Sequence, residues 1–262
     1  MNTAPATIAP ALRAFLERLI DYAGIYPPAA LPLDTAVKNY QSYQSGEFSW
    51  MLRWLVVGNK ELQNVPDLLD GNISLLSESD DARAATLETK SVIKAKHPVY
   101  CEIALDKLDQ LDEIKAAGNF AKIRTGSVKA DAIPSPKDVA AFISACAERR
   151  LPFKATAGLH HPIRAEYALT YEANAPRAVM HGFLNVLMAA AFAWRGEKNI
   201  EAIIAETDAS AFTFDGGAKW RDLTLSVEQI KDARANFMHS IGSCSFDEPV
   251  HELQVLGLLP NS

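Results

Sequence analysis

Long apolar segments are missing from this chain of 262 residues. No run of about 18 consecutive apolar residues occurs, so the sequence predicts no membrane-spanning helix. The first ten residues also lack the basic region and the apolar core that are typical of a secretory signal peptide. Cysteine is scarce: Cys101, Cys146 and Cys244 follow no regular spacing. An odd number of cysteines without a signal peptide fits a reducing compartment, so we expect a cytoplasmic protein.

An excess of positive charge is absent as well. The chain has 26 Lys and Arg residues against 32 Asp and Glu residues, which gives a net charge of −6. This balance argues against nucleic acid or an anionic membrane as the main partner. With 48% hydrophobic residues the chain can bury a large core, and we expect its partner to be a small molecule. Whether the chain forms a homo-oligomer stays open, because one sequence reveals no surface patch.

Strand-like and helix-like segments alternate along the chain, which favours a mostly parallel sheet covered by helices. The expected strands lie at residues 54–57, 73–76, 99–105, 121–125, 152–157, 212–214 and 240–245. The expected helices lie at residues 12–24, 33–43, 80–94, 108–117, 135–150, 182–194, 227–237 and 249–256. Seven or eight strands predict an α/β fold, a single-domain (β/α)8 TIM-like barrel, with an open sheet as the alternative. Residues 1–50 are expected as a helical extension packed on the barrel of residues 51–262.

Two strand-length segments that end in basic residues point to a site. Successive side chains of a strand point to opposite faces, so Lys122 shares a face with Arg124, and Lys154 shares a face with Thr156. On the preceding strand, Glu102 is expected on the same inner face. One carboxylate against three cations leaves a positive surplus that an anionic ligand would neutralise. The alternatives are an internal ion network without function, or a register shifted by one residue.

Histidines cluster in the second half of the chain. His160 and His161 follow the strand that carries Lys154, with Arg164 close behind, and His181 precedes a helix that contains Asn185. These histidines, with Glu102 and Asp215, could hold a divalent ion, although their spacing matches no zinc pattern. We therefore predict no cofactor and keep a divalent metal as the alternative.

Small residues near the carboxyl terminus suggest a loop that contacts a ligand. Ser243, Cys244 and Ser245 lie just before the last expected helix, where barrel enzymes often bind phosphate. We expect Cys244 to be a small inert residue. Near the amino terminus, residues 21–28 are expected to be a helix end packed under the barrel, with a lid as the alternative.

Some of the sequence motifs resemble those of known protein families. The segments 21–28, 122–126, 153–161, 181–185 and 242–245 resemble an uncharacterised bacterial protein family, for which no activity is implied. The run Lys154-Ala-Thr-Ala-Gly158 is also similar to the lysine motif of class I aldolases of the deoxyribose-phosphate type. That resemblance implies Lys154 as a Schiff-base nucleophile and Lys122 as a second lysine that lowers its pKa. The Ser and Thr pattern is incomplete, and the second lysine motif of that family has no clear match.

Three functions remain open. The first is a lyase or aldolase-like enzyme that acts on a small anionic carbonyl compound. The second is a phosphoribosyltransferase-like or metal-dependent enzyme that uses the same cluster, and the third is a sensor of small anions. The expected catalytic residues are Lys154, Lys122, Glu102 and His160. The expected substrate-binding residues are Arg124, Thr125, Thr156, His161, Arg164, His181, Asn185, Ser243 and Ser245.

Overall fold

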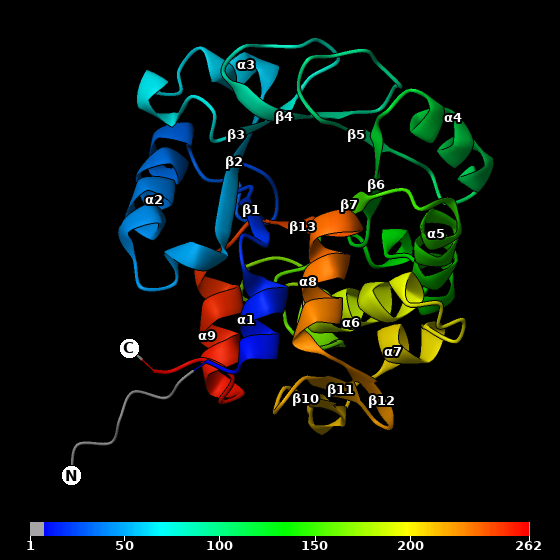
Figure 1. Cartoon of the computed structure of the whole chain (residues 1–262). Coiled ribbons are helices and arrows are strands. Elements are labelled where there is room, and N and C mark those ends of the chain that lie inside the picture. The colour runs from blue at the N-terminus through cyan, green and yellow to red at the C-terminus, as the bar shows by residue number, and fades with distance from the viewer. Residues whose placement is uncertain (1–7, 262) are drawn as a thin grey trace.

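Eight parallel strands close into a barrel in the computed structural model, which describes residues 8–261 (Figure 1). The predicted TIM-like α/β fold is therefore confirmed. The strands, in the order in which they pair around the barrel, are β1 (Ile20–Tyr22), β13 (Met238–Ser243), β7 (Phe153–Thr156), β6 (Phe120–Arg124), β5 (Val99–Glu102), β4 (Ala84–Thr89), β3 (Ile73–Leu76) and β2 (Leu52–Gly58).

Helices pack around this barrel. They are α1 (Pro10–Leu16), α2 (Leu33–Ser45), α3 (Asn59–Leu62), α4 (Leu111–Ala116), α5 (Pro136–Arg149), α6 (Phe183–Trp194), α7 (Glu201–Ala205), α8 (Val227–Asn236) and α9 (Asp247–Val255). Helix α5 begins as expected, with a capping box between Ser135 and Asp138. Every residue of α6 is buried, which explains its apolar sequence. Within residues 8–261, no helix is long and apolar enough to cross a membrane.

Two small antiparallel sheets lie outside the barrel. One is a hairpin of β8 (Ala165–Ala168) and β9 (Arg177–Met180) in the long segment after β7. The other contains β10 (Phe212–Thr213), β11 (Ala218–Trp220) and β12 (Leu223–Leu225), and it lies at the bottom of the view in Figure 1. The short strand expected near residues 212–214 therefore exists, but it does not belong to the barrel.

One expected helix is wrong, and another is too long. Residues 84–89 form barrel strand β4, although the helix formers Ala, Arg, Leu and Glu predict a helix over 80–94. Pairing with β3 and β5 overrides that local preference, as it often does for short segments. The helix expected over 12–24 ends at Leu16, and residues 20–22 form β1. The segment expected as a helical extension thus supplies the first strand of the barrel.

The predicted alternation of faces holds in β6 and β7. Ala121, Ile123, Phe153 and Ala155 are buried in the hydrophobic core, whereas Lys122 and Lys154 pair in register and enter an ion network. The neighbouring strand places Glu102 in register with Lys122. The core therefore lies between the barrel and its helices, and charged side chains meet inside the barrel.

Candidate active site

Two lysines and three carboxylates form one buried network inside the barrel. The Lys154 ammonium lies 2.5 Å from Asp21 Oδ2 and 2.6 Å from Glu88 Oε1. The Lys122 ammonium lies 2.9 Å from Glu88 Oε2 and 2.9 Å from Glu102 Oε2. Glu88 therefore joins the two lysines, and the five charges form one continuous chain of ion pairs.

Hydroxyl groups and opposite charges stabilise this network. Ser74 donates a hydrogen bond of 2.7 Å to Glu88, and Ser240 donates one of 2.7 Å to Asp21. Burial alone would raise the pKa of Glu88, but the charges of Lys154 and Lys122 outweigh it and hold that pKa well below its usual range. Burial alone would lower the pKa of Lys154, but Asp21 and Glu88 outweigh it and raise that pKa. Lys154 is therefore a paired ammonium ion.

The expected surplus of positive charge at the lysines is not observed. The expectation counted Glu102 as the sole carboxylate, whereas Asp21 and Glu88 also contact the lysines. The sequence does not predict Asp21 as a partner of the lysines, because its strand has three residues, too few to show an alternation of buried and exposed faces. Glu88 was missed because a helix was expected there. The one available signal was the pair Thr86 and Glu88, which would share a face in a strand.

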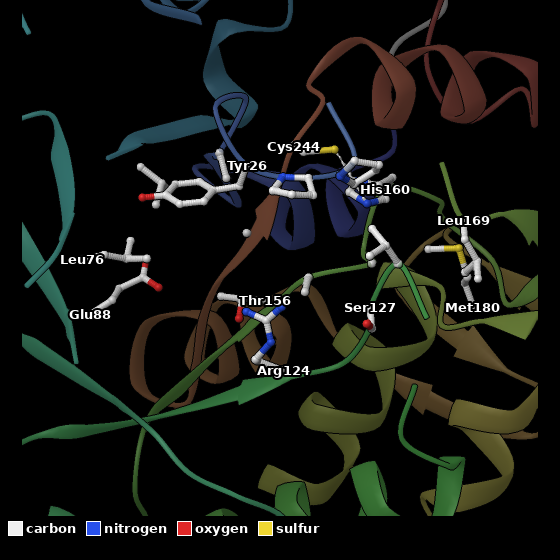
Figure 2. A pocket seen from close by; sticks show the side chains of 18 of the residues that line it. Tyr26, Leu76, Glu88, Arg124, Ser127, Thr156, His160, Leu169, Met180 and Cys244 are labelled. Atoms are coloured by element: carbon white, nitrogen blue, oxygen red, sulfur yellow. Dashed lines mark hydrogen bonds between the residues drawn. The ribbon is translucent and has the colours of Figure 1, made fainter. Parts of the chain in front are cut away.

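A cavity of about 250 Å³ opens above this network, at the carboxyl ends of the strands; we call it the mouth cavity. Figure 2 shows Glu88 on one side, Cys244 and His160 on the other, and Arg124 between them. A second, larger hollow of about 750 Å³, the side cavity, adjoins it. The two cavities share part of their lining: Tyr26, Leu76, Glu88, Lys122 and Arg124. Lys154 lines neither of them and is fully buried.

Within the described residues, Arg124 is the cation of this site that has no partner. Its side chain is exposed and lines both cavities, and within residues 8–261 its guanidinium forms no ion pair and no side-chain hydrogen bond. Lys122, by contrast, is held by two carboxylates. Arg124 therefore presents its charge and its donors to whatever occupies the cavities.

His160 faces the mouth cavity from the loop after β7. Burial lowers the pKa of His160 to about 3, so the imidazole is neutral near pH 7. Ser243 donates its hydroxyl hydrogen to the carbonyl of Ser245 at 2.6 Å, so the 3.0 Å contact between Ser243 and His160 uses Nδ1–H as the donor. Nε2 is then a hydrogen-bond acceptor. Cys244 lies beside the same ring, and burial raises its pKa to about 11, which makes it a thiol.

Thr156 joins this site, because its side chain lines the mouth cavity. Thr125 instead donates to the carbonyl of Ala157 at 2.9 Å and links the ends of β6 and β7. Ser245 accepts the backbone N–H of Glu248 at the start of α9. Neither Thr125 nor Ser245 lines the mouth cavity.

The remaining expected residues lie elsewhere. His161 stacks on Tyr167 and contacts Glu252 at 2.6 Å. Asn185 connects the backbone of Arg164 to the carbonyls of Ile203 and Glu206. His181 contacts the carbonyl of Pro134 at 2.8 Å and the Arg164 side chain at 3.5 Å. His161, Arg164, His181 and Asn185 are thus held by partners away from the mouth cavity. In the described part of the chain, no three His, Cys, Asp or Glu side chains are grouped to hold a metal ion.

Comparisons with known proteins identify no family for this chain. No protein family, no curated protein and no solved structure matches this chain. The resemblance to aldolases is therefore supported only at the level of the fold, an eight-stranded parallel barrel of the TIM type. TIM barrels commonly carry enzyme active sites at the carboxyl ends of their strands, and both cavities lie there.

Proposed function

We propose that this barrel is an enzyme that transfers a proton next to the carbonyl group of a small anionic compound. The observation that carries the proposal is the place of Arg124 beside Lys122. An unpartnered guanidinium and an ammonium held by two carboxylates line the same two cavities. Such a pair suits a ligand that carries a carboxylate or phosphate and a nearby carbonyl oxygen.

Arg124 would anchor the anionic group. A guanidinium fork matches a carboxylate or a phosphate in two parallel hydrogen bonds. Arg124 needs no protein carboxylate to be displaced first, since it has no such partner within residues 8–261. The apolar lining of the mouth cavity, which includes Val56, Leu169 and Met180, would contact the rest of the ligand. A cavity of about 250 Å³ restricts that ligand to a small molecule.

Lys122 and Glu102 would carry out the proton transfer. Glu88 already has three partners, Ser74, Lys154 and Lys122. Within residues 8–261, Glu102 has the one partner Lys122, and its side chain is 20% exposed. Glu102 lines the side cavity, so its carboxylate would remove a proton from a carbon next to the carbonyl that lies where the two cavities meet, beside Lys122. The electrons of that C–H bond then form a C=C bond, and the carbonyl π electrons move to oxygen, which the Lys122 ammonium stabilises. Addition of this carbon to an electrophile, or loss of a leaving group from the carbon next to it, would follow from the same enolate.

Lys154 would act as a positioning residue in this proposal. An imine requires a neutral amine that the carbonyl can reach. Lys154 lines neither cavity, contacts Asp21 and Glu88, and has a raised pKa. Its charge instead holds Glu88 ionised, and Glu88 in turn holds Lys122 toward the cavities. We therefore assign the stabilisation of the enolate oxygen to Lys122 and leave imine formation as the competing mechanism.

Hydrogen–deuterium exchange tests this proposal without knowledge of the natural substrate. Pyruvate, 2-oxobutyrate and dihydroxyacetone phosphate each carry an anionic group near a carbonyl with exchangeable C–H bonds. We expect the protein to catalyse exchange of at least one of them in D2O, followed by NMR. Loss of one charge-assisted contact in Arg124→Gln should lower kcat/KM roughly 10- to 100-fold.

Controls separate this outcome from its alternatives. Arg195→Gln removes an exposed arginine beyond the end of α6, and its exchange rate should equal that of the wild type. Borohydride treatment with each compound should leave no adduct; an adduct on Lys154 or Lys122 would replace our mechanism with the imine. Binding of all three compounds without exchange would overturn the enzymatic proposal in favour of a sensor.

A further inference from the structure

A third cavity lies at the opposite end of the barrel, and the proposed function does not use it. This hollow of about 630 Å³, the base cavity, is lined by residues at the amino-terminal ends of the strands. Arg53, Tyr100 and His239 are each the second residue of their strands, β2, β5 and β13. Helices α1 and α8, which lie side by side in Figure 1, contribute Ala14 and Arg234.

In the part of the chain that the structure describes, three arginines line the base cavity without a carboxylate partner. Within residues 8–261, no carboxylate oxygen lies within 4.0 Å of the side chains of Arg18, Arg53 or Arg234. The Arg234 guanidinium donates to the backbone carbonyls of Met238 and Glu17. Backbone carbonyls satisfy donors but do not neutralise a charge, so the positive charge of this group remains.

Two atoms of these arginines lack any partner. Four buried side-chain nitrogen and oxygen atoms in the described part of the chain have no hydrogen bond, and Arg53 Nη1 and Arg234 Nε are two of them. An unsatisfied buried donor costs free energy, and more so when it belongs to a charged group. Both atoms belong to residues that line the same cavity, but each atom has less than 1 Å² of exposed area, so an occupant with acceptor oxygens would reach them only after these side chains move.

The other charged groups near this cavity do not remove the surplus. The charge of Asp21 acts on Arg53 and Arg234, and that of Glu88 acts on Arg53. Both carboxylates already contact Lys154, although Asp21 Oδ1 has no hydrogen-bond partner within residues 8–261. Lys231 is paired with Glu228 at 3.0 Å. Glu17 is exposed and is the one acidic residue of the lining.

His239 adds no positive charge to the base cavity. Burial, together with Arg53 and Arg234, lowers the pKa of His239 to about 4. His239 is therefore neutral near pH 7, and its Nδ1 contacts the Tyr100 hydroxyl at 2.7 Å. The surplus of positive charge in this cavity is thus carried by the arginines.

We propose that the base cavity binds a phosphate-bearing small molecule, with Arg18, Arg53 and Arg234 as its anion partners. Guanidinium groups match phosphate oxygens in geometry and charge. The volume of about 630 Å³ lies within the range of small-molecule sites and exceeds the needs of a single inorganic ion. Trp54 and Phe120 line the same cavity and offer aromatic surface to the organic part of the ligand. Arg18 stacks over Trp54 at 4.7 Å from the ring centroid, and its side chain is exposed.

Inorganic pyrophosphate is a suitable probe, with calorimetry as the measurement. We expect saturable binding to the wild-type protein at low ionic strength and a higher Tm in its presence, because a ligand of the folded state stabilises it. Arg18 is exposed, so Arg18→Gln should fold normally, and it should weaken binding about tenfold through loss of one charge-assisted contact. Arg53→Met tests a deeper partner and should weaken binding further.

Matched variants decide between this cavity and other anion sites. Lys137→Gln removes an exposed cation at the start of α5 that lines no cavity described above, and it should leave pyrophosphate binding unchanged. Arg124→Gln should leave pyrophosphate binding at the base cavity unchanged as well. The test of this inference is therefore independent of the test of the proposed function. Absence of saturable binding in the wild type would overturn the inference. Equal binding by the wild type and Arg18→Gln, with loss in Arg124→Gln, would also overturn it.

Discussion

At the scale of single residues, Lys154 shows how much a buried charge depends on its partners. Its side chain is completely buried and contacts two carboxylates. Removal of the ammonium leaves Asp21 and Glu88 close together without the cation that compensates them. We expect Lys154→Met to lower the free energy of unfolding by about 3–5 kcal/mol, as measured by urea denaturation near pH 7.

A surface pair provides the control for that substitution. Lys198 lies 3.6 Å from Glu148, and both side chains are more than half exposed, so Lys198→Met should change stability by less than about 1 kcal/mol. Addition of Glu88→Gln to Lys154→Met should restore part of the lost stability, because one of the uncompensated charges is then gone. A loss below about 1 kcal/mol in Lys154→Met would contradict the network described here.

The candidate site could be predicted from the sequence only in part, for reasons that are visible residue by residue. Lys122 and Lys154 were found because a lysine on a strand between helices is unusual, and alternation then fixed their face. Asp21 and Glu88, which neutralise them, come from segments far away in the sequence. Distant pairing of this kind leaves no local pattern. The sequence therefore indicated a charged interior but gave the wrong charge balance.

At the scale of elements, the error at β4 has a simple cause. Residues 84–89 combine strong helix formers with a strand environment that exists only when β3 and β5 are present on either side. By contrast, α5 was predicted well because its start depends on residues that are adjacent in the chain, Ser135 and Pro136. Local signals thus located the helices with caps, whereas barrel strands depend on their neighbours.

The loops after β6 and β7 meet at two glycines, and this contact supports a further prediction. A Cβ atom at Gly126 would lie 2.7 Å from Gly158 Cα and 2.9 Å from the carbonyl oxygen of Ala157. Both neighbours are backbone atoms, so the loops must separate to accept a methyl group. We expect Gly126→Ala to destabilise the protein by about 1–3 kcal/mol and to disturb the mouth cavity, since Gly158 and Ala157 line it. Thermal unfolding measures the first effect.

Gly46 is the matched control for this substitution. A Cβ atom there would lie no closer than 3.6 Å to any other atom, and its φ of −79° is ordinary for any residue. Gly46→Ala should therefore leave the Tm within a few degrees of the wild type. Equal unfolding temperatures for Gly126→Ala and Gly46→Ala would mean that the two loops are not held against each other.

At the scale of the whole molecule, buried neutral histidines make the stability depend on pH. Burial lowers the pKa of His160 to about 3 and that of His239 to about 4, and it lowers the pKa of His181. In the unfolded chain each histidine titrates near 6.5. Below that pH the unfolded chain binds protons that the folded barrel does not, so unfolding becomes more favourable.

The stabilisation is thus complete above about pH 6.5 and declines as the pH falls toward the folded pKa values. Between pH 7 and pH 5, His160 and His239 should each remove about 2 kcal/mol from the free energy of unfolding. Urea titrations at both pH values measure the sum. Glu88, whose pKa is lowered, adds its own loss only below about pH 4.3, the pKa of an unfolded glutamate, so the two effects occupy separate ranges.

His160→Asn tests the contribution of one buried imidazole, and it should reduce the difference in the free energy of unfolding between pH 7 and pH 5 by about 2 kcal/mol. His97, which lies near the surface beside Asp80, provides the comparison, and His97→Asn should leave most of that difference in place. A free energy of unfolding that is equal at pH 7 and pH 5 would mean that these imidazoles become charged inside the folded barrel, and the neutral His160 of the mouth cavity would then have to be abandoned.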